Sequence, residues 1–146
     1  MALDQSYISE NAAECEHLRS LANRLTDEEL ARPLDAGWTV SAVLAHLAFW
    51  DHRALVLVKK WEKEGIGSSP IDTDIVNEAT RLFCLAIPPR TAAELAISCA
   101  QNIDQALERI SPAMAADIER IGKTVHLNRA DHRRDHLGQI ERALGT

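Results

Sequence analysis

Apolar residues recur at helical spacing along most of the chain, and this pattern restricts the fold more than any other feature of the sequence. The clearest case runs from Thr39 or Ser41 to about Glu64. Its apolar residues form one broad stripe: Val40, Val43, Leu44, Leu47, Ala54, Leu55, Val58 and Trp61. Period-two runs of β-branched and aromatic residues, which are typical of strands, are missing. At 1.5 Å per residue this helix is roughly 40 Å long, the length of a bundle helix.

The same spacing predicts three more long helices, from about Leu3 to Leu25, from Thr91 to Ile110, and within Val125–Leu144. Thr91 and Glu94 have the spacing of a capping box, so Thr91 is the expected N-cap of its helix. We expect the apolar stripe of this helix to hold Leu95, Cys99, Ile103, Leu107 and Ile110.

Shorter helices are predicted between the long ones. A second capping box joins Thr26 to Glu29, Thr73–Ala86 has helical spacing, and Met114–Ile121 is weakly helical. Long helices with modest connections bury their stripes best against one another. The sequence therefore predicts one all-α domain, residues 1–146, folded as a four-helix bundle with short connecting helices.

Composition excludes several classes of protein. Hydrophobic residues make up 46% of the 146 residues and charged residues 26%, which is too apolar for a disordered chain. The net charge of -6 and the lack of a basic stripe argue against a nucleic-acid partner. No apolar run approaches the roughly 20 residues that span a bilayer, and Met1–Glu10 has no signal pattern. We therefore expect a cytoplasmic protein with no membrane partner.

The three cysteines show no C-x-x-C spacing, which argues against a disulfide framework or a cysteine-rich zinc site. Cys84 and Cys99 have apolar helical neighbours and are expected as small core residues.

Two histidines one helical turn apart carry the strongest chemical signal. His132 and His136 share a stripe with Ile140, next to the stripe of Leu137, and therefore face the core or its edge. Imidazoles at this spacing can share a metal ion, although an isolated pair is also common as ordinary half-buried histidines.

Two known metal-binding motifs do not match these residues. A zinc protease of the H-E-x-x-H type needs glutamate where the chain has Arg133, and a di-iron bundle needs two Glu-x-x-His motifs. Only one such motif, Glu14 to His17, is present, and it is expected on a solvated helix face. The histidine pair therefore needs a third ligand from another helix.

His46 is the candidate for that ligand. It lies among apolar neighbours on the second long helix, where an imidazole without a polar partner would cost roughly 1–3 kcal/mol. A single such histidine is more often a core residue, but three neutral imidazoles plus water are a known open coordination set. His52, His126 and His17 are out of phase or on another helix and are expected not to be ligands.

Two sequence blocks resemble the DinB-like superfamily, which includes the YfiT-type thiol transferases and the mycothiol-dependent maleylpyruvate isomerases. The blocks are Gly37–Ser41 followed by Val43–Ala48, and the terminal segment His132–Ile140. The resemblance implies an up-down-down-up four-helix bundle, often dimeric. It also implies a divalent ion held by one histidine of the second helix and two of the fourth, which map onto His46, His132 and His136.

The implied ion is zinc or nickel first, with iron, manganese or copper as alternatives, because imidazole suits all of them. The characterised relatives act with a low-molecular-weight thiol, so the resemblance implies an S-transferase or isomerase acting on a small electrophilic substrate. Trp50 and Asn128 are each one turn from a ligand and are candidates for substrate binding, although packing or capping explains them equally well. Asp131 and Asp135 are more readily explained by salt links than by contacts to a ligand.

Two functions stay open from the sequence. One is a metal-dependent, thiol-dependent enzyme, and the other is a non-enzymatic, stress-related binding bundle with a structural or vestigial metal. A homodimer is expected in either case, because the apolar stripes are broad.

Overall fold

The computed structural model describes residues 4–122 and 124–146, and every regular element longer than an isolated bridge in these ranges is helical. The elements in chain order are α1 (Ser6–Arg24), α2 (Asp27–Leu30), η1 (Asp35–Gly37), α3 (Val40–Glu64), α4 (Thr73–Ala86), α5 (Pro89–Arg109), α6 (Pro112–Ile121) and α7 (Ala130–Leu144). The predicted all-α bundle is confirmed.

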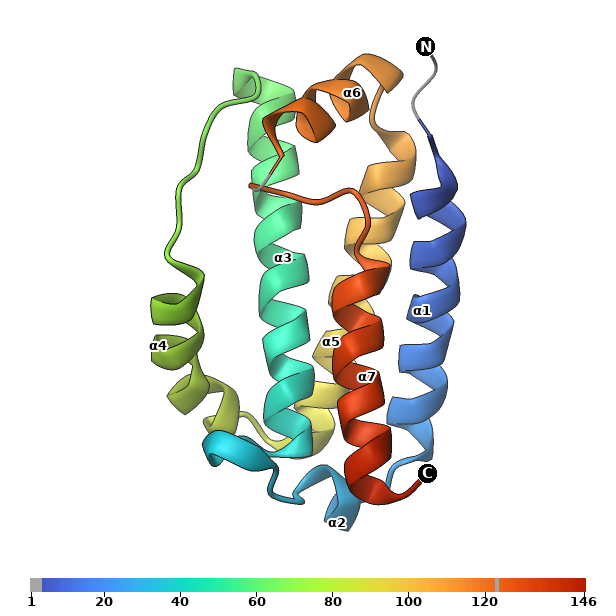
Figure 1. Ribbon diagram of the computed structural model, residues 1–146, viewed down its shortest axis with the longest axis vertical. Helices are drawn as coiled ribbons and strands as arrows, with labels where there is room; N and C mark the ends of the chain where they lie inside the picture. The colour runs from blue at the N-terminus through green and yellow to red at the C-terminus, as the bar shows by residue number, and fades with distance from the viewer. Residues whose placement is uncertain (1–3, 123) are drawn as a thin grey trace.

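Four long helices form the body of the molecule. In Figure 1, α1 and α7 run downward while α3 and α5 run upward, and α1 contacts both α5 and α7. α4 lies outside this group along α3, and α6 crosses the end at which α3 and α5 finish. The bundle therefore has one long side where α3 and α7 face each other beside α4.

α5 packs against the bundle through small side chains. Its buried residues are Ala92, Ala93, Ala96, Ala100, Ile103 and Leu107. The predicted stripe was wrong at Leu95, which is 40% exposed, and Cys99 is only half-buried, whereas Cys84 is buried as expected. The buried alanines lie in the N-terminal part of α5. Alanines let two helix backbones approach closely, so this part of the helix needs no large apolar residue.

Two predicted helical segments differ from the structure. α5 begins at Pro89 and not at Thr91, because proline suits a first helical turn, where its missing N–H has no helical partner. The weakly helical segment is a regular helix, α6, with Ser111 as its N-cap. The expected start of the first helix at Leu3 lies outside the described residues.

The last helix lies within the predicted range Val125–Leu144: α7 begins at Ala130, after a segment of turns and irregular structure. Arg53 donates to the carbonyl oxygen of Thr124 at 3.0 Å, and the Asn11 amide donates to that of Leu127 at 2.9 Å. These long-range hydrogen bonds fix the irregular segment that leads to Arg129, the N-cap residue of α7.

α3 is long and apolar enough to cross a bilayer by length and composition, but 67% of its most apolar window is buried inside the bundle. A core helix of a bundle passes the same test, so the described residues contain no clear membrane span.

His17 joins α1 to α7 through two carboxylates. Its Nδ1 lies 2.9 Å from Glu14 Oε1 and its Nε2 lies 3.1 Å from Glu141 Oε1. Burial lowers the pKa of His17, but hydrogen bonds and charge from Glu14 and Glu141 outweigh it, so the pKa is raised. The Glu14 motif was expected on a solvated helix face, but it is part-buried and belongs to a contact between α1 and α7.

We predict that this link makes stability depend on pH. Because the folded-state pKa of His17 is above its ordinary value of 6.5, its contribution is full below that pH and is lost as the pH rises through the folded pKa. Urea unfolding of metal-free wild-type and His17→Gln protein should show a stability difference that is largest in acid and shrinks toward pH 8. A difference that grows with pH would contradict this.

Candidate metal centre

α3 places His46 in the interior. Thr39 accepts the N–H of Ala42 at 3.1 Å and so fixes the start of the helix, and the stretch Val40–Ala48 is buried. His46 is 6% exposed, and the Trp38 ring packs edge-on against it with the centroids 5.5 Å apart.

α7 presents the other two histidines. The side-chain oxygen of Asn11 accepts the backbone N–H groups of Arg129 at 2.7 Å and Ala130 at 3.0 Å, which fixes the first turn of the helix. His132 and His136 follow on the side that faces α3, and both are half-buried.

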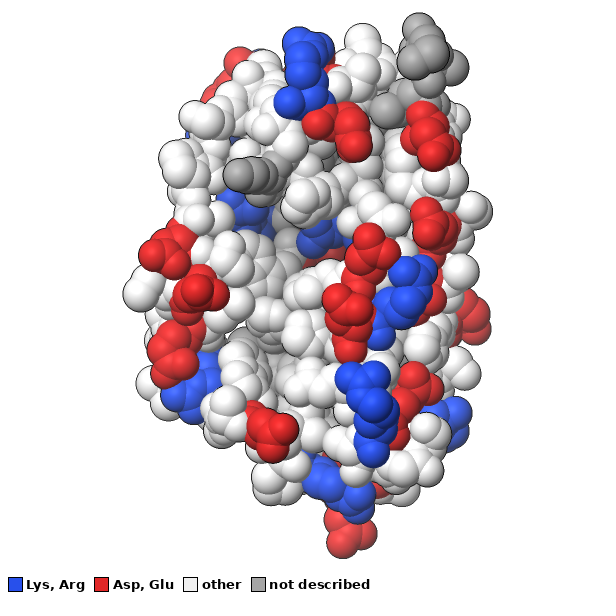
Figure 2. Space-filling view, viewed as in Figure 1, with Lys and Arg blue, Asp and Glu red and all other residues white. Residues whose placement is uncertain are grey.

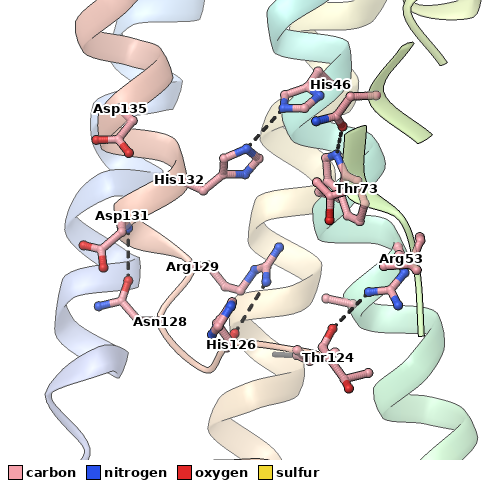
Figure 3. A pocket seen from close by; sticks show the side chains of 15 residues that line it. His46, Arg53, Thr73, Thr124, His126, Asn128, Arg129, Asp131, His132 and Asp135 are labelled. Atoms are coloured by element: carbon pink, nitrogen blue, oxygen red, sulfur yellow. Dashed lines mark hydrogen bonds between the residues drawn. The ribbon is translucent and has the colours of Figure 1, made fainter. Parts of the chain in front are cut away.

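The three imidazoles converge on one point. The Nε2 atoms of His46 and His132 are 3.2 Å apart, and a dashed line joins the two rings in Figure 3. The His136 ring centroid lies 4.9 Å from that of His46 and 4.8 Å from that of His132. One ring nitrogen from each histidine lies within 4.8 Å of the others, so the group can hold a metal ion.

The surroundings keep two of these rings neutral. Burial, with the charge of His136 as a smaller cause, lowers the pKa of His46 to about 4. Burial and the neighbouring charges of His136 and His46 lower the pKa of His132 to about 3. Neutral imidazole is the form that binds metals, so lone pairs are available at neutral pH.

Three observations show that the residues fit a divalent ion. Two imidazole nitrogens on one tetrahedral ion lie roughly 3.3–3.4 Å apart, close to the distance found for His46 and His132. His46 Nδ1 is buried without a hydrogen-bond partner among the described residues, so no protein group occupies this nitrogen, and either nitrogen of the ring can serve as the ligand atom. His136 Nδ1 donates to Gln139 Oε1 at 3.0 Å, which leaves its Nε2 lone pair free.

A cleft of about 510 Å³ opens next to the cluster between α3, α4 and α7. His46 and His132 line it, together with Trp50 and Asn128, the two candidates for substrate binding. Trp50 Nε1 donates to Asn77 Oδ1 at 2.8 Å, and Asn128 accepts the N–H of Asp131 at 3.0 Å. Both residues therefore have structural partners as well as a place in the cleft.

The remaining predicted residues lie as follows. His52 is exposed, and His126 lines the cleft but stands apart from the three-histidine group. Asp131 accepts from Arg134 at 2.9 Å, the salt link expected for it. Asp135 is exposed at the mouth of the cleft.

A buried charge network behind the cleft was not foreseen. Arg133 is 0% exposed; its Nη2 lies 3.2 Å from Asp51 Oδ2 and 2.8 Å from Asp104 Oδ1. Asp51 also accepts from Arg129 Nε at 2.9 Å. The helical phase of Arg133 relative to Leu137 was a signal that it faces the core.

The described residues thus form a helical bundle that brings three histidines from two helices together, and two of them, His46 and His132, line a cleft. The chain also matches the family model described as the mycothiol maleylpyruvate isomerase N-terminal domain over residues 11–124. It belongs to this family, which is a DinB-like superfamily domain. No curated protein and no solved structure gave a significant match.

The matched residues include His46 but end before α7. The placement of His132 and His136 beside His46 is therefore an observation from the structure that the family match does not itself provide.

Proposed function

We propose that this protein is a divalent-metal-dependent enzyme that works with a low-molecular-weight thiol. It is an S-transferase, which joins the thiol to a small electrophilic substrate through sulfur, or an isomerase that uses the thiol to rearrange such a substrate. The observation that carries the proposal is that two members of the three-histidine group, His46 and His132, line an open cleft. A structural ion has no need of such access, whereas a catalytic ion keeps an open coordination position for its substrate.

Each part of the proposed site has a task. His46, His132 and His136 hold the ion, and zinc and nickel are the first candidates among the metals that imidazole binds. The ion supplies Lewis acidity that lowers the pKa of a bound thiol, so that the thiolate exists near neutral pH. Trp50 offers an apolar face to a substrate, and Asn128 offers a polar edge at the mouth of the cleft.

The proposal predicts that a thiol binds the ion directly. Cobalt(II)-substituted protein should develop a thiolate-to-cobalt charge-transfer absorption when N-acetylcysteine is added, because a sulfur atom enters the coordination sphere. The band should be missing in His132→Ala protein treated in the same way. His126→Ala is the matched control, since this histidine lines the same cleft outside the metal group, and it should keep the band.

The same samples separate the two functions left open by the sequence. An enzyme should also accelerate the reaction of N-acetylcysteine with an electrophile such as 1-chloro-2,4-dinitrobenzene. A metal chelator should abolish this acceleration. Bound metal with neither thiol absorption nor turnover would favour the non-enzymatic binding bundle.

We further propose a cytoplasmic homodimer acting on small molecules. The support for a dimer is apolar surface on α4, where Leu82 and Phe83 are each 70% exposed. Light scattering after size exclusion should give twice the chain mass, and Phe83→Glu should shift the protein toward the monomer. A monomeric wild-type protein would refute the dimer.

A further inference from the structure

Two arginines line the cleft beside the histidine group. Arg53 follows His46 by seven residues, so it lies two turns further along the same face of α3, about 10 Å along the helix axis. Arg129 precedes His132 by three residues at the start of α7. Figure 3 shows both guanidinium groups reaching toward the cleft from these two elements.

Arg53 has no carboxylate partner within the described ranges. Its Nη1 donates to the carbonyl oxygen of Thr124 at 3.0 Å, and its Nη2 to that of Ser69 at 3.2 Å, with a longer 3.5 Å contact to Ser69 Oγ. A guanidinium carries five N–H donors, so these bonds position the group and leave donors unused.

Only two of the three guanidinium nitrogens of Arg129 have a partner in the described residues. Its Nε donates to Asp51 Oδ1 at 2.9 Å and its Nη1 contacts the carbonyl oxygen of His126 at 3.5 Å. No residue of the described chain pairs with its Nη2. Asp51 also accepts from Arg133, so one carboxylate serves two guanidinium groups.

The charges around the cleft do not balance. Three guanidinium groups, those of Arg53, Arg129 and Arg133, are matched by the buried or part-buried carboxylates of Asp51 and Asp104. Burial, and then the charge of Arg129, lower the pKa of Arg53, as expected for like charges close together in a partly dry site.

Acidic residues are present nearby but lie on the rim. Figure 2 shows basic atoms recessed in the hollow on this face and acidic residues on either side. Asp131 and Asp135 line the mouth and are exposed, and Asp131 is bound to Arg134. Water screens such exposed charges, so the inner excess of one positive charge persists.

We propose that Arg53 and Arg129 form a subsite for a carboxylate group of the substrate, next to the three-histidine group. One unit of excess charge matches a carboxylate, which carries one negative charge, better than a phosphate monoester, which carries nearly two at neutral pH. The planar fork of arginine also binds carboxylates in a fixed orientation. The inference rests on the proposed function in one respect: it assumes that the substrate binds in this cleft.

Titration of the full-length protein with benzoate tests the subsite, with benzamide as the neutral analogue of the same shape. Binding is followed through the side-chain Nε–H signals of ¹⁵N-labelled arginine, with and without bound zinc. We expect benzoate to shift signals assigned to Arg53 and Arg129, and to bind about tenfold or more tightly than benzamide in both states. Phenyl phosphate should bind no more tightly than benzoate.

Variants connect the binding to the residues. Arg53→Gln should weaken benzoate binding about tenfold, Arg53→Lys should recover part of the loss, and Arg120→Gln on exposed α6 should have no effect. The Arg53 variants should keep the metal content of the wild type, and they should keep its thiol absorption with 2-mercaptoethanol, a thiol without a carboxylate. The test of the subsite therefore fails separately from the proposed function. Arg53→Gln could weaken binding by disturbing the 124–129 segment, to which Arg53 donates a hydrogen bond. Arg53→Lys keeps the positive charge, so a partial recovery of binding in this variant shows that the charge itself contributes.

Several results would overturn the subsite. These are equal binding of benzoate and benzamide, no benzoate binding at all, or unchanged binding in both Arg53 variants. Benzoate binding that needs zinc would show the carboxylate to be a metal ligand, and much tighter binding of phenyl phosphate would show a phosphate site.

Discussion

Replacing Arg133 with alanine will lower the free energy of unfolding by about 3–5 kcal/mol, because it leaves the carboxylates of Asp51 and Asp104 without their buried partner. Arg133 also donates to the backbone carbonyl oxygens of Asn11 at 3.1 Å and Ala100 at 3.4 Å, so helices α1 and α5 lose hydrogen bonds as well. Urea denaturation of the purified protein measures the loss.

Arg134→Ala is the matched control, since this neighbour lies on the exposed side of α7 and its ion pairs are screened by water. Its effect should stay below about 1 kcal/mol. The loss in Arg133→Ala should also shrink in acid, because burial raises the pKa of Asp104 and a protonated carboxyl no longer needs a cation. Equal losses in the two variants would show that the network contributes no stability.

The second large effect concerns metal binding. Wild-type protein should bind about one divalent ion per chain, and His46→Ala or His132→Ala should reduce the affinity by more than about 100-fold. Losing only a hydrogen-bond partner of a metal ligand already costs roughly 10–100-fold, and these variants remove a ligand itself. Elemental analysis after dialysis against a defined zinc concentration gives the stoichiometry.

His52→Ala serves as the control on α3, because this histidine is exposed and stands outside the three-histidine group. It should bind zinc as the wild type does. The bound ion should also raise the melting temperature of the wild type and of His52→Ala, since a ligand that binds only the folded state stabilises it by mass action. Unchanged metal content in His46→Ala and His132→Ala would refute the ligand assignment.

The sequence predicted the parts of the molecule that depend on local periodicity. The extent of α3 and the capping box at Thr26 follow from spacing and cap chemistry over a few residues, and both are present in the structure. The histidine pair on α7 was recognised for the same reason, because i and i+4 residues share a face of any helix. His46 was identified from its apolar neighbours.

What the sequence did not predict depends on contacts between distant segments. The start of α7 at Ala130 is set by Asn11, more than a hundred residues earlier in the chain. Asp51 and Arg133 lie in apolar stripes. A charged residue in such a stripe is predicted to be exposed as long as no partner on another helix is known. The role of the cleft arginines Arg53 and Arg129 was not predicted, because it depends on which carboxylates neutralise them in the folded protein.

The central claim is that three imidazoles from α3 and α7 hold one metal ion at the wall of the cleft. X-ray absorption at the zinc edge of zinc-loaded protein tests it most directly, since it counts the imidazoles around the ion. We predict three imidazole ligands in the wild type and two in His136→Ala. Two or fewer imidazoles in the wild type, or an identical spectrum for His46→Ala, would contradict the account.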